Sequence, residues 1–242
     1  MGFLNSGLFN MICSEGVFAE GWPHYLLYAG LILAVMASAY LLGSLSSAII
    51  VSGVMFGDDV RKHGSGNAGM TNMLRTYGKG AAALTLLGDM LKTALAILIC
   101  GIVFGFSYNN GVSLNGYCYL AGLCAVLGHV YPIFYGFKGG KGVLVTATMA
   151  LILTPAVFFA LLLTFAIILA VSGYVSLGSI TVAALFPFSV CAYSLAVAGG
   201  LSLLTVLCTV FLGAFVIWCH RSNIKRLVSG TEKKISIGKK EK

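Results

Sequence analysis

Charged residues are scarce in this sequence. Asp, Glu, Lys and Arg together make up 9% of its 242 residues, whereas 59% are hydrophobic. A soluble domain normally has roughly a quarter of its residues charged, so the composition excludes that class. Together with a mean hydropathy of +0.97, it predicts an all-α membrane protein that crosses the bilayer several times.

Other features are missing as well. The first 24 positions contain no Lys or Arg, so the basic n-region of a secretory signal peptide is absent and the first apolar run is expected to stay as a span. The seven cysteines form no CxxC pair, which indicates neither a zinc site nor a disulfide framework. We expect no metal and no cofactor. The basic residues cluster beside apolar runs, which disfavours nucleic acid as a partner.

Apolar runs and polar interruptions divide the chain into three parts. We expect an extracytoplasmic lead at 1–24, a transmembrane domain at 25–232 and a basic cytoplasmic tail at 233–242. The expected spans lie at about 25–56, 81–106, 115–135, 143–153, 155–171, 180–197 and 201–219.

The stretch 143–171, which is broken at Thr154-Pro155, decides the topology. Eight of the fifteen Lys and Arg residues follow position 220. One crossing by this stretch would place them opposite the other basic loops, against the positive-inside rule. Two crossings place every basic cluster in the cytoplasm, so we predict seven transmembrane helices with the N-terminus outside. The helix 143–153 is then short, because it rises only ~16 Å against a hydrocarbon core of ~30 Å.

A polar, glycine-rich segment interrupts the apolar sequence at residues 64–75, which read GSGNAGMTNMLR. Its glycines, Gly66 among them, allow backbone N–H groups to turn inward and form a concavity that binds anions. Arg75 adds a planar fork that suits phosphate. The neutral hydrogen-bonding residues of the segment are Ser65, Asn67, Thr71 and Asn72. We therefore expect the loop 57–80 to bind a phosphorylated molecule at the membrane surface.

A second basic segment reads Lys138-Gly139-Gly140-Lys141-Gly142. Two ammonium groups around a glycine pair suit a phosphate, although a basic loop that merely obeys the positive-inside rule would look similar. The spacing differs from a Walker A loop and no Ser or Thr follows Lys141, which disfavours an ATP site. Because the sequence also contains the polar segment 64–75, we favour phosphate binding over a merely basic loop.

The predicted topology places loops 57–80, 137–142 and 174–179 and the start of the tail on one face, where they can converge. His220 and Asn223 are three residues apart and share a face on a continuing helix. His220 can act as an acid or base near neutral pH, or can simply complement the helix C-terminus. Ser176 offers a hydroxyl. In the second span Asp89 and Lys92 are expected either to pair with each other or to find partners on other helices, and to support the site.

Eight motifs follow one another from about Tyr40 to Ile235, roughly four-fifths of the chain. They are Gly43-Ser44, Asp59-Val60-Arg61, residues 64–75, Gly128-His129-Val130-Tyr131-Pro132, residues 137–142, Val175-Ser176-Leu177, His220-Arg221-Ser222-Asn223 and Gly230-Thr231-Glu232. In this order they resemble the bacterial integral-membrane glycerol-3-phosphate acyltransferases that use acyl phosphate, the PlsY family. Met70, where that family usually has Ala, and Ser46, where Pro is common, depart from the pattern.

The resemblance implies seven transmembrane helices in the bacterial inner membrane and an active site that faces the cytoplasm. It implies transfer of a fatty acyl group from acyl phosphate to the sn-1 hydroxyl of glycerol 3-phosphate, which gives lysophosphatidic acid and phosphate, the first step of phospholipid synthesis. Its expected partners are glycerol 3-phosphate, acyl phosphate, membrane lipids and the peripheral enzyme that makes acyl phosphate.

The resemblance also implies roles for individual residues. The implied catalytic residues are Ser65, Lys141, His220 and Asn223. The implied phosphate-binding residues are Ser65, Gly66, Asn67, Thr71, Arg75, Lys138, Gly139, Gly140, Lys141 and Ser176. The base is either His220 or an oxygen of the substrate phosphate. The alternative to an enzyme is a transporter or binder of a phosphorylated small molecule. The sequence shows no inverted repeat, which argues against a transporter.

Overall fold

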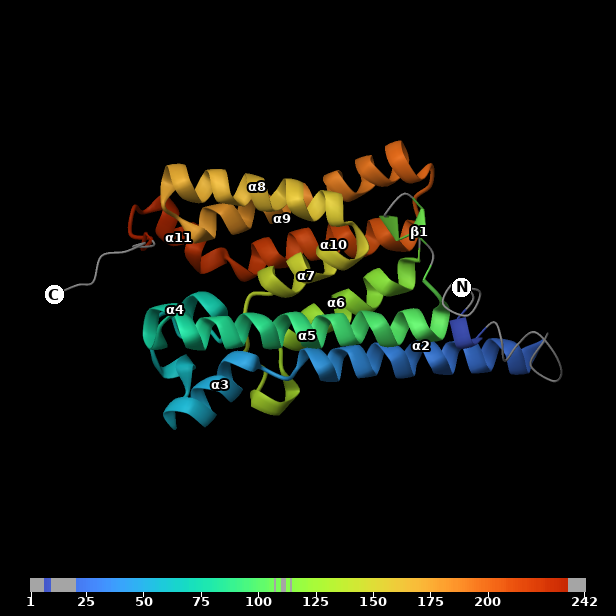
Figure 1. Ribbon diagram of the computed structural model, residues 1–242, viewed down its shortest axis with the longest axis horizontal. Coiled ribbons are helices and arrows are strands. Elements are labelled where there is room, and N and C mark those ends of the chain that lie inside the picture. The colour runs from blue at the N-terminus through green and yellow to red at the C-terminus, as the bar shows by residue number, and fades with distance from the viewer. Residues whose placement is uncertain (1–6, 10–20, 107, 110–111, 114, 235–242) are drawn as a thin grey trace.

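The computed structural model describes residues 7–9, 21–106, 108–109, 112–113 and 115–234, so most of the predicted lead and of the basic tail lies outside the described residues. Its long helices run along one axis (Figure 1). In chain order the helices are α2 (Trp22–Gly43), α3 (Ser47–Phe56), α4 (Met70–Tyr77), α5 (Lys79–Phe104), α6 (Gly116–Val130), α7 (Val143–Leu153), α8 (Pro155–Ser172), α9 (Val175–Tyr193), α10 (Leu203–Cys219) and α11 (Arg221–Val228).

The longer connections between these helices carry short elements. Two 3₁₀ turns, η2 (Val60–Lys62) and η3 (Ile133–Tyr135), lie in the polar loops, and a π turn, η4 (Ser194–Ala198), extends α9. A hairpin of two-residue strands, β1 (Tyr108–Asn109) and β2 (Val112–Ser113), follows α5. The described chain is otherwise helical, as the composition predicts.

Several helices have the length and composition of membrane spans. Five segments qualify on their own: 22–56, α5, 116–135, α8 and 175–198; α10 together with α11, which is bent by 55°, is a possible sixth. Large apolar side chains point outward, as a lipid-facing surface requires, and Val157 is the one buried residue of α8. The short α7 adds eleven apolar residues.

The predicted break in the stretch 143–171 is confirmed. Helix α7 ends at Leu153, and α8 begins at Pro155, where the ring fixes a helical φ and no N–H donor is lost from the ladder. Three predicted boundaries differ. The first span is interrupted between Gly43 and Ser47, α4 begins inside the predicted loop 57–80, and α9 begins inside the predicted loop 174–179.

Helices α2 and α6 pack with their backbones in contact. A methyl group added at Gly43 would collide with the Ala125 carbonyl oxygen, and one at Gly128 would collide with that of Tyr40. Small residues allow this close approach between membrane helices. The Tyr40 hydroxyl also donates to the Tyr131 carbonyl at 2.8 Å, which holds the end of α6 and the segment that follows it.

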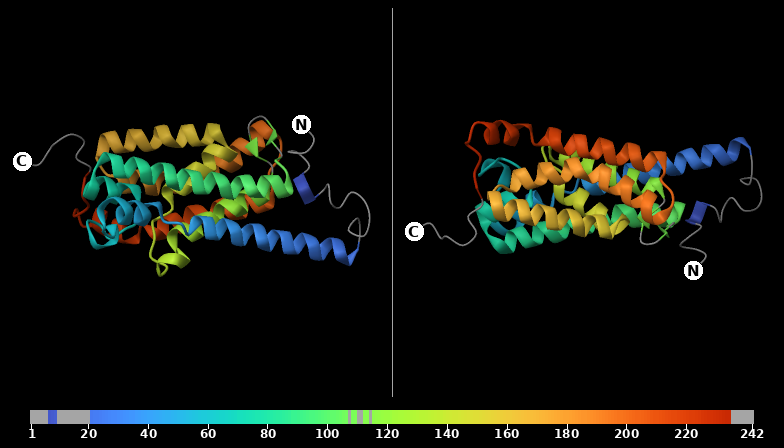
Figure 2. Two further views of the ribbon diagram at one scale, coloured as in Figure 1. Left: turned by 60° about the horizontal axis from the view of Figure 1, so that its bottom comes forward. Right: turned by 90° about the horizontal axis from the view of Figure 1, so that it is seen from above.

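A small apolar cluster supports the polar loop before α4. Its buried members are Ala48, Val60, Ala68, Met73, Ala81 and Ala82. They come from α3, η2, α4 and α5 and from the loop itself, so the loop rests on a packed base. Figures 1 and 2 show α4 and α11 at the same end of the bundle, while α2 projects beyond the other end. The polar segments therefore gather at one end.

Candidate active site

A cavity of about 640 Å³ opens at the end of the bundle that carries α4 and α11. The four polar segments that the sequence predicted to share one face all contribute to its wall. Eight of the predicted site residues line it: Ser65, Asn67, Thr71, Arg75, Lys141, Ser176, His220 and Asn223. Four others do not: Gly66, Lys138, Gly139 and Gly140.

The loop before α4 is shaped by left-handed glycines and by one asparagine. Gly64 and Gly66 have φ angles of 59° and 70°, which glycine adopts without strain. The buried Asn72 donates from Nδ2 to the carbonyls of Val60 at 3.1 Å and His63 at 3.0 Å, and its Oδ1 accepts from the Ser65 N–H at 3.0 Å. Asn72 therefore organises the loop, whereas the sequence had placed it among the anion-binding groups.

Helix α4 presents two site residues from one face. Thr71 and Arg75 lie one turn apart and both line the cavity. The amino end of α4 also borders the cavity, where its first N–H groups and partial positive charge favour an anion. Arg75 is exposed and has no carboxylate partner among the described residues. Its guanidinium is therefore available to a phosphate.

Lys141 begins a chain of hydrogen bonds that crosses the cavity mouth. Its ammonium donates to Asn223 Oδ1, and Asn223 Nδ2 donates to Glu232 Oε1 at 2.7 Å. The Ser176 hydroxyl donates to the same oxygen at 2.7 Å, while Arg226 Nε donates to Glu232 Oε2 at 2.6 Å. Glu232 thereby ties the segment after α11 to the first turn of α9.

Positive charge exceeds negative charge around this chain of hydrogen bonds. Burial, and then the nearby Arg226, lower the pKa of Lys141 to about 8, although Glu232 opposes this shift. Burial disfavours the carboxylate of Glu232, but hydrogen bonds from Ser176, Asn223 and Arg226 outweigh burial and keep its pKa below the usual value. Lys141 and the unpaired Arg75 thus leave an excess of positive charge that an anionic ligand would neutralise.

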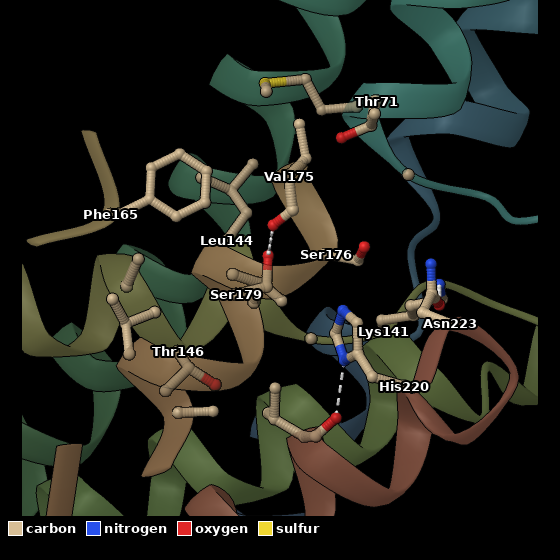
Figure 3. Close-up of a pocket in the computed structure, with 18 of the residues that line it drawn as sticks. Thr71, Lys141, Leu144, Thr146, Phe165, Val175, Ser176, Ser179, His220 and Asn223 are labelled. Atoms are coloured by element: carbon tan, nitrogen blue, oxygen red, sulfur yellow. Dashed lines mark hydrogen bonds between the residues drawn. The ribbon is translucent and has the colours of Figure 1, made fainter. Parts of the chain in front are cut away.

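His220 has one ring nitrogen anchored and the other turned to the cavity. Its Nδ1 lies 2.7 Å from the Val216 carbonyl oxygen, so Nδ1 carries a proton that it donates. In the neutral ring Nε2 is then an acceptor. Figure 3 shows this second nitrogen facing the space that Thr71, Ser176 and Ser179 border. The geometry suits an acceptor of a substrate proton or hydrogen bond.

Beyond these polar groups the cavity continues between α7, α8, α9 and α10. Its wall there is apolar: Leu144, Ala147, Ala150, Phe158, Leu161, Leu162, Phe165, Val182, Ala183, Phe186, Leu212 and Val216. One cavity therefore joins a cationic mouth to an apolar arm. Such a shape fits a molecule with an anionic head and a hydrocarbon chain.

The Gly139-Gly140 pair was predicted to bind a phosphate, but it lies outside the cavity wall. The Gly139 N–H donates to the Val130 carbonyl at 3.1 Å, and the Gly140 N–H donates to the His129 carbonyl at 3.0 Å. These donors are used within the fold, so they are not turned to a phosphate. Lys138 is exposed outside the cavity, and its carbonyl accepts from Arg61 Nη1 at 3.2 Å.

Sequence reasoning missed two groups at the mouth, Glu232 and Arg226. Glu232 appeared only as part of a motif, and Arg226 was one of many basic residues after α10. A signal for Glu232 was present, because it is the one acidic residue between Asp89 and Glu241. The predicted pair in α5 is confirmed, with Lys92 Nζ 2.8 Å from Asp89 Oδ1. Among the described residues, no cluster of three or more His, Cys, Asp or Glu could hold a metal.

The helical bundle and its cavity define a membrane protein that handles an amphipathic anion. A sequence model described as glycerol-3-phosphate acyltransferase matches residues 33–230. The glycerol-3-phosphate acyltransferase of Clostridioides difficile is 41% identical over 209 residues, covering 86% of this chain and 97% of the relative. That of Syntrophomonas wolfei is 42% identical over 203 residues, covering 84% and 96%.

Two solved structures are also similar to this chain. The integral membrane glycerol 3-phosphate acyltransferase PlsY (YgiH), in its glycerol 3-phosphate form, matches with a TM-score of 0.73 and 34% identity over 85% of this chain and 96% of its own. Its lysophosphatidic acid form matches with a TM-score of 0.70 and 32% identity over 85% and 95%. The chain belongs to the glycerol-3-phosphate acyltransferase family. It is an integral membrane acyltransferase, which decides against the transporter alternative.

Proposed function

We propose that the protein transfers a fatty acyl group from acyl phosphate to the sn-1 hydroxyl of glycerol 3-phosphate. The observation that carries this proposal is the single cavity that joins Arg75 and Lys141 to an apolar arm. Acyl phosphate and lysophosphatidic acid both have a phosphate head and a hydrocarbon chain, and each can fill such a cavity. The similar PlsY was crystallised in glycerol 3-phosphate and lysophosphatidic acid forms, which supports both as ligands here.

The placement in the membrane follows from charge. We propose seven spans, counting α2 and α3 as one and α7 as the short seventh, in a transmembrane domain at 25–232 between the lead and the basic tail. Within the described ranges, the Lys and Arg residues outside the bundle core flank the cavity end, and the opposite end has none. Under the positive-inside rule this distribution supports a cavity at the cytoplasmic face of the bacterial inner membrane and an N-terminus outside, as we propose. A peripheral enzyme would supply acyl phosphate from that side.

Two groups of residues would hold the phosphates. Arg75, in the last turn of α4, offers a bidentate fork on the same face as Thr71, which lies at the amino end of the helix. The hydroxyl and amide of Ser65 and Asn67 lie on the adjoining loop. Lys141 supplies a second positive charge from across the cavity. Asn223 accepts directly from its ammonium, and Glu232, which accepts from both Asn223 and Ser176, holds Asn223 in place.

The proposed reaction is an acyl transfer between two oxygens. The sn-1 oxygen of glycerol 3-phosphate attacks the acyl carbonyl carbon, a new C–O ester bond forms, and the C–O bond to the phosphate breaks. The hydroxyl proton goes either to His220 Nε2 or to a phosphate oxygen of the substrate. Acyl phosphate is already activated, so binding both substrates in register and stabilising negative charge with Arg75 and Lys141 supply most of the acceleration.

The direct test is product formation by purified protein given palmitoyl phosphate and glycerol 3-phosphate in detergent. We expect lysophosphatidic acid from the parent and a loss of at least about 100-fold in kcat/KM for Arg75→Ala, because the variant lacks a charge-assisted pair to phosphate. Lys79→Ala is the matched control, since Lys79 is exposed near the same end but does not line the cavity. A folded parent that makes no product would refute the proposal.

A further inference from the structure

We propose that His129, held by Lys92 and Asp89, is a positioning residue for the acyl transfer. It forms the surface on which the Gly139-Gly140 pair rests, and so it sets where Lys141 enters the cavity. The inference rests on the proposed function in one respect, which is that Lys141 binds a substrate phosphate.

The contact between His129 and the glycine pair is unusually close. A methyl group added at Gly140 would overlap Nε2 of the His129 ring, and one added at Gly139 would overlap the His129 carbonyl oxygen. The same carbonyl accepts the Gly140 N–H at 3.0 Å. The two glycines are therefore required because the chain lies directly on His129, and Lys141 is the next residue.

His129 is in turn fixed by a buried ion pair. Lys92 Nζ lies 2.8 Å from Asp89 Oδ1, 2.8 Å from the Leu45 carbonyl oxygen and 3.1 Å from His129 Nδ1. An ammonium has no lone pair, so Lys92 donates to the Leu45 carbonyl and to His129 Nδ1, which accepts, and its charge is paired with the Asp89 carboxylate. The ring proton then sits on Nε2, the nitrogen that faces Gly140.

The cost of this arrangement indicates a role beyond packing. Asp89, Lys92 and His129 are 1%, 4% and 4% exposed. The desolvation of charges at such depth can exceed what their pairing recovers, and replacing a buried ion pair by apolar residues of similar size is often neutral or stabilising. Ionisable groups inside a membrane bundle are retained for function. Here Asp89 and His129 also form part of the cavity wall.

The pKa of Lys141 depends on how deeply its ammonium group is buried, so it indicates where the side chain lies. The groups around it are Arg75 from α4, Cys219 and His220 from the end of α10, Arg226 from α11 and Glu232 beyond α11. Burial among them lowers its pKa to about 8. If His129 no longer supports the loop, Lys141 moves toward water and its pKa rises toward the ordinary lysine value of about 10.4.

The experiment measures the pKa of Lys141 by competitive acetylation across pH, read by mass spectrometry on the substrate-free, full-length protein. We expect a midpoint near 8 in the parent and a shift of at least one pH unit in His129→Ala, with KM for glycerol 3-phosphate raised about tenfold. Ile97→Ala is the control, because Ile97 is buried on the same helix as Lys92 but lies away from the cavity. It should lower thermal stability and leave the midpoint unchanged. An unchanged midpoint in His129→Ala overturns the proposal.

Gly140→Ala alone tests the same contact with His129 in place, and so it covers a poorly folding His129→Ala: the added methyl group should displace the loop and raise the Lys141 midpoint by at least one pH unit. Gly140→Ala should lower kcat/KM in the parent, whereas in the His129→Ala background the added methyl group has room, so the two effects should not add. Strictly additive effects on kcat/KM and on the Lys141 midpoint overturn the proposal. The two proposals can fail separately, because acetylation needs no substrate. A parent without acyl-transfer activity would refute the proposed function, and the Lys141 midpoints would still test whether His129 positions Lys141.

Discussion

Raising the pH from 7 to 9 should weaken glycerol 3-phosphate binding through one residue, Lys141. Its pKa in the substrate-free protein is about 8, so about 90% of the ammonium is charged at pH 7 and about 10% at pH 9. Because the pKa is lowered, the charge is present below pH 8 and is lost above it. The substrate phosphate has its second pKa near 6 and stays dianionic across this interval.

The magnitude follows from these fractions. If the charged ammonium is required to bind the dianion, KM for glycerol 3-phosphate should rise about tenfold between pH 7 and pH 9, which corresponds to about 1.4 kcal/mol of binding free energy. The assay is initial-rate measurement at saturating palmitoyl phosphate at pH 7, 8, 9 and 10. The steepest change in KM is expected above pH 8.

Two variants identify the titrating group. Lys141→Arg keeps its charge throughout this range, so its KM should be higher overall but nearly independent of pH. Lys138→Ala removes an exposed lysine outside the cavity and should reproduce the parent profile. A parent KM that does not change between pH 7 and 9, or a Lys141→Arg profile with the same alkaline rise, would refute the reasoning.

Three further outcomes are expected. Replacing His220 by Ala should lower kcat by about 10²–10⁴-fold if Nε2 takes the hydroxyl proton, whereas near-normal turnover would give that role to the substrate phosphate. Glu232→Gln removes the negative charge that pairs with Arg226. It should lower the free energy of unfolding, measured by denaturant titration, by about 1–3 kcal/mol. An unchanged denaturation midpoint would contradict this. Ala147→Leu narrows the apolar arm and should reduce turnover of palmitoyl phosphate more than of decanoyl phosphate, unlike Ala160→Leu on the exposed face of α8.

The sequence predicted the features that depend on local pattern and charge. Proline at position 155 lacks an N–H donor and disfavours a helical conformation at the residue before it, so the break between α7 and α8 was visible, although Pro187 lies within α9 without ending that helix. The distribution of Lys and Arg placed the polar segments on one face without knowledge of any contact. The starts of α4 and α9 were hidden because their first turns, around Thr71 and Ser176, carry the polar and small residues that also form loops.

The roles that depend on distant contacts were not predictable in this way. Gly139 and Gly140 looked like phosphate-binding glycines, because nothing in their neighbourhood shows that His129 lies against them. Glu232 gains its role only when the chain after α11 folds back to Ser176. The first contact joins residues 10 and 11 positions apart across the turn η3, and the second joins residues 56 positions apart; the sequence alone gives no measure of such distances in space.

The apolar arm between α7 and α10 has a consequence for how this enzyme meets its lipid substrate. If acyl phosphate is the donor, as proposed, an arm enclosed by helices that stand in the bilayer would draw it from the membrane and not from water. The concentration that governs the rate is then the mole fraction of acyl phosphate among the surrounding amphiphiles. Adding detergent at a fixed amount of acyl phosphate dilutes the substrate at the site, so two laboratories with identical bulk concentrations can measure different rates.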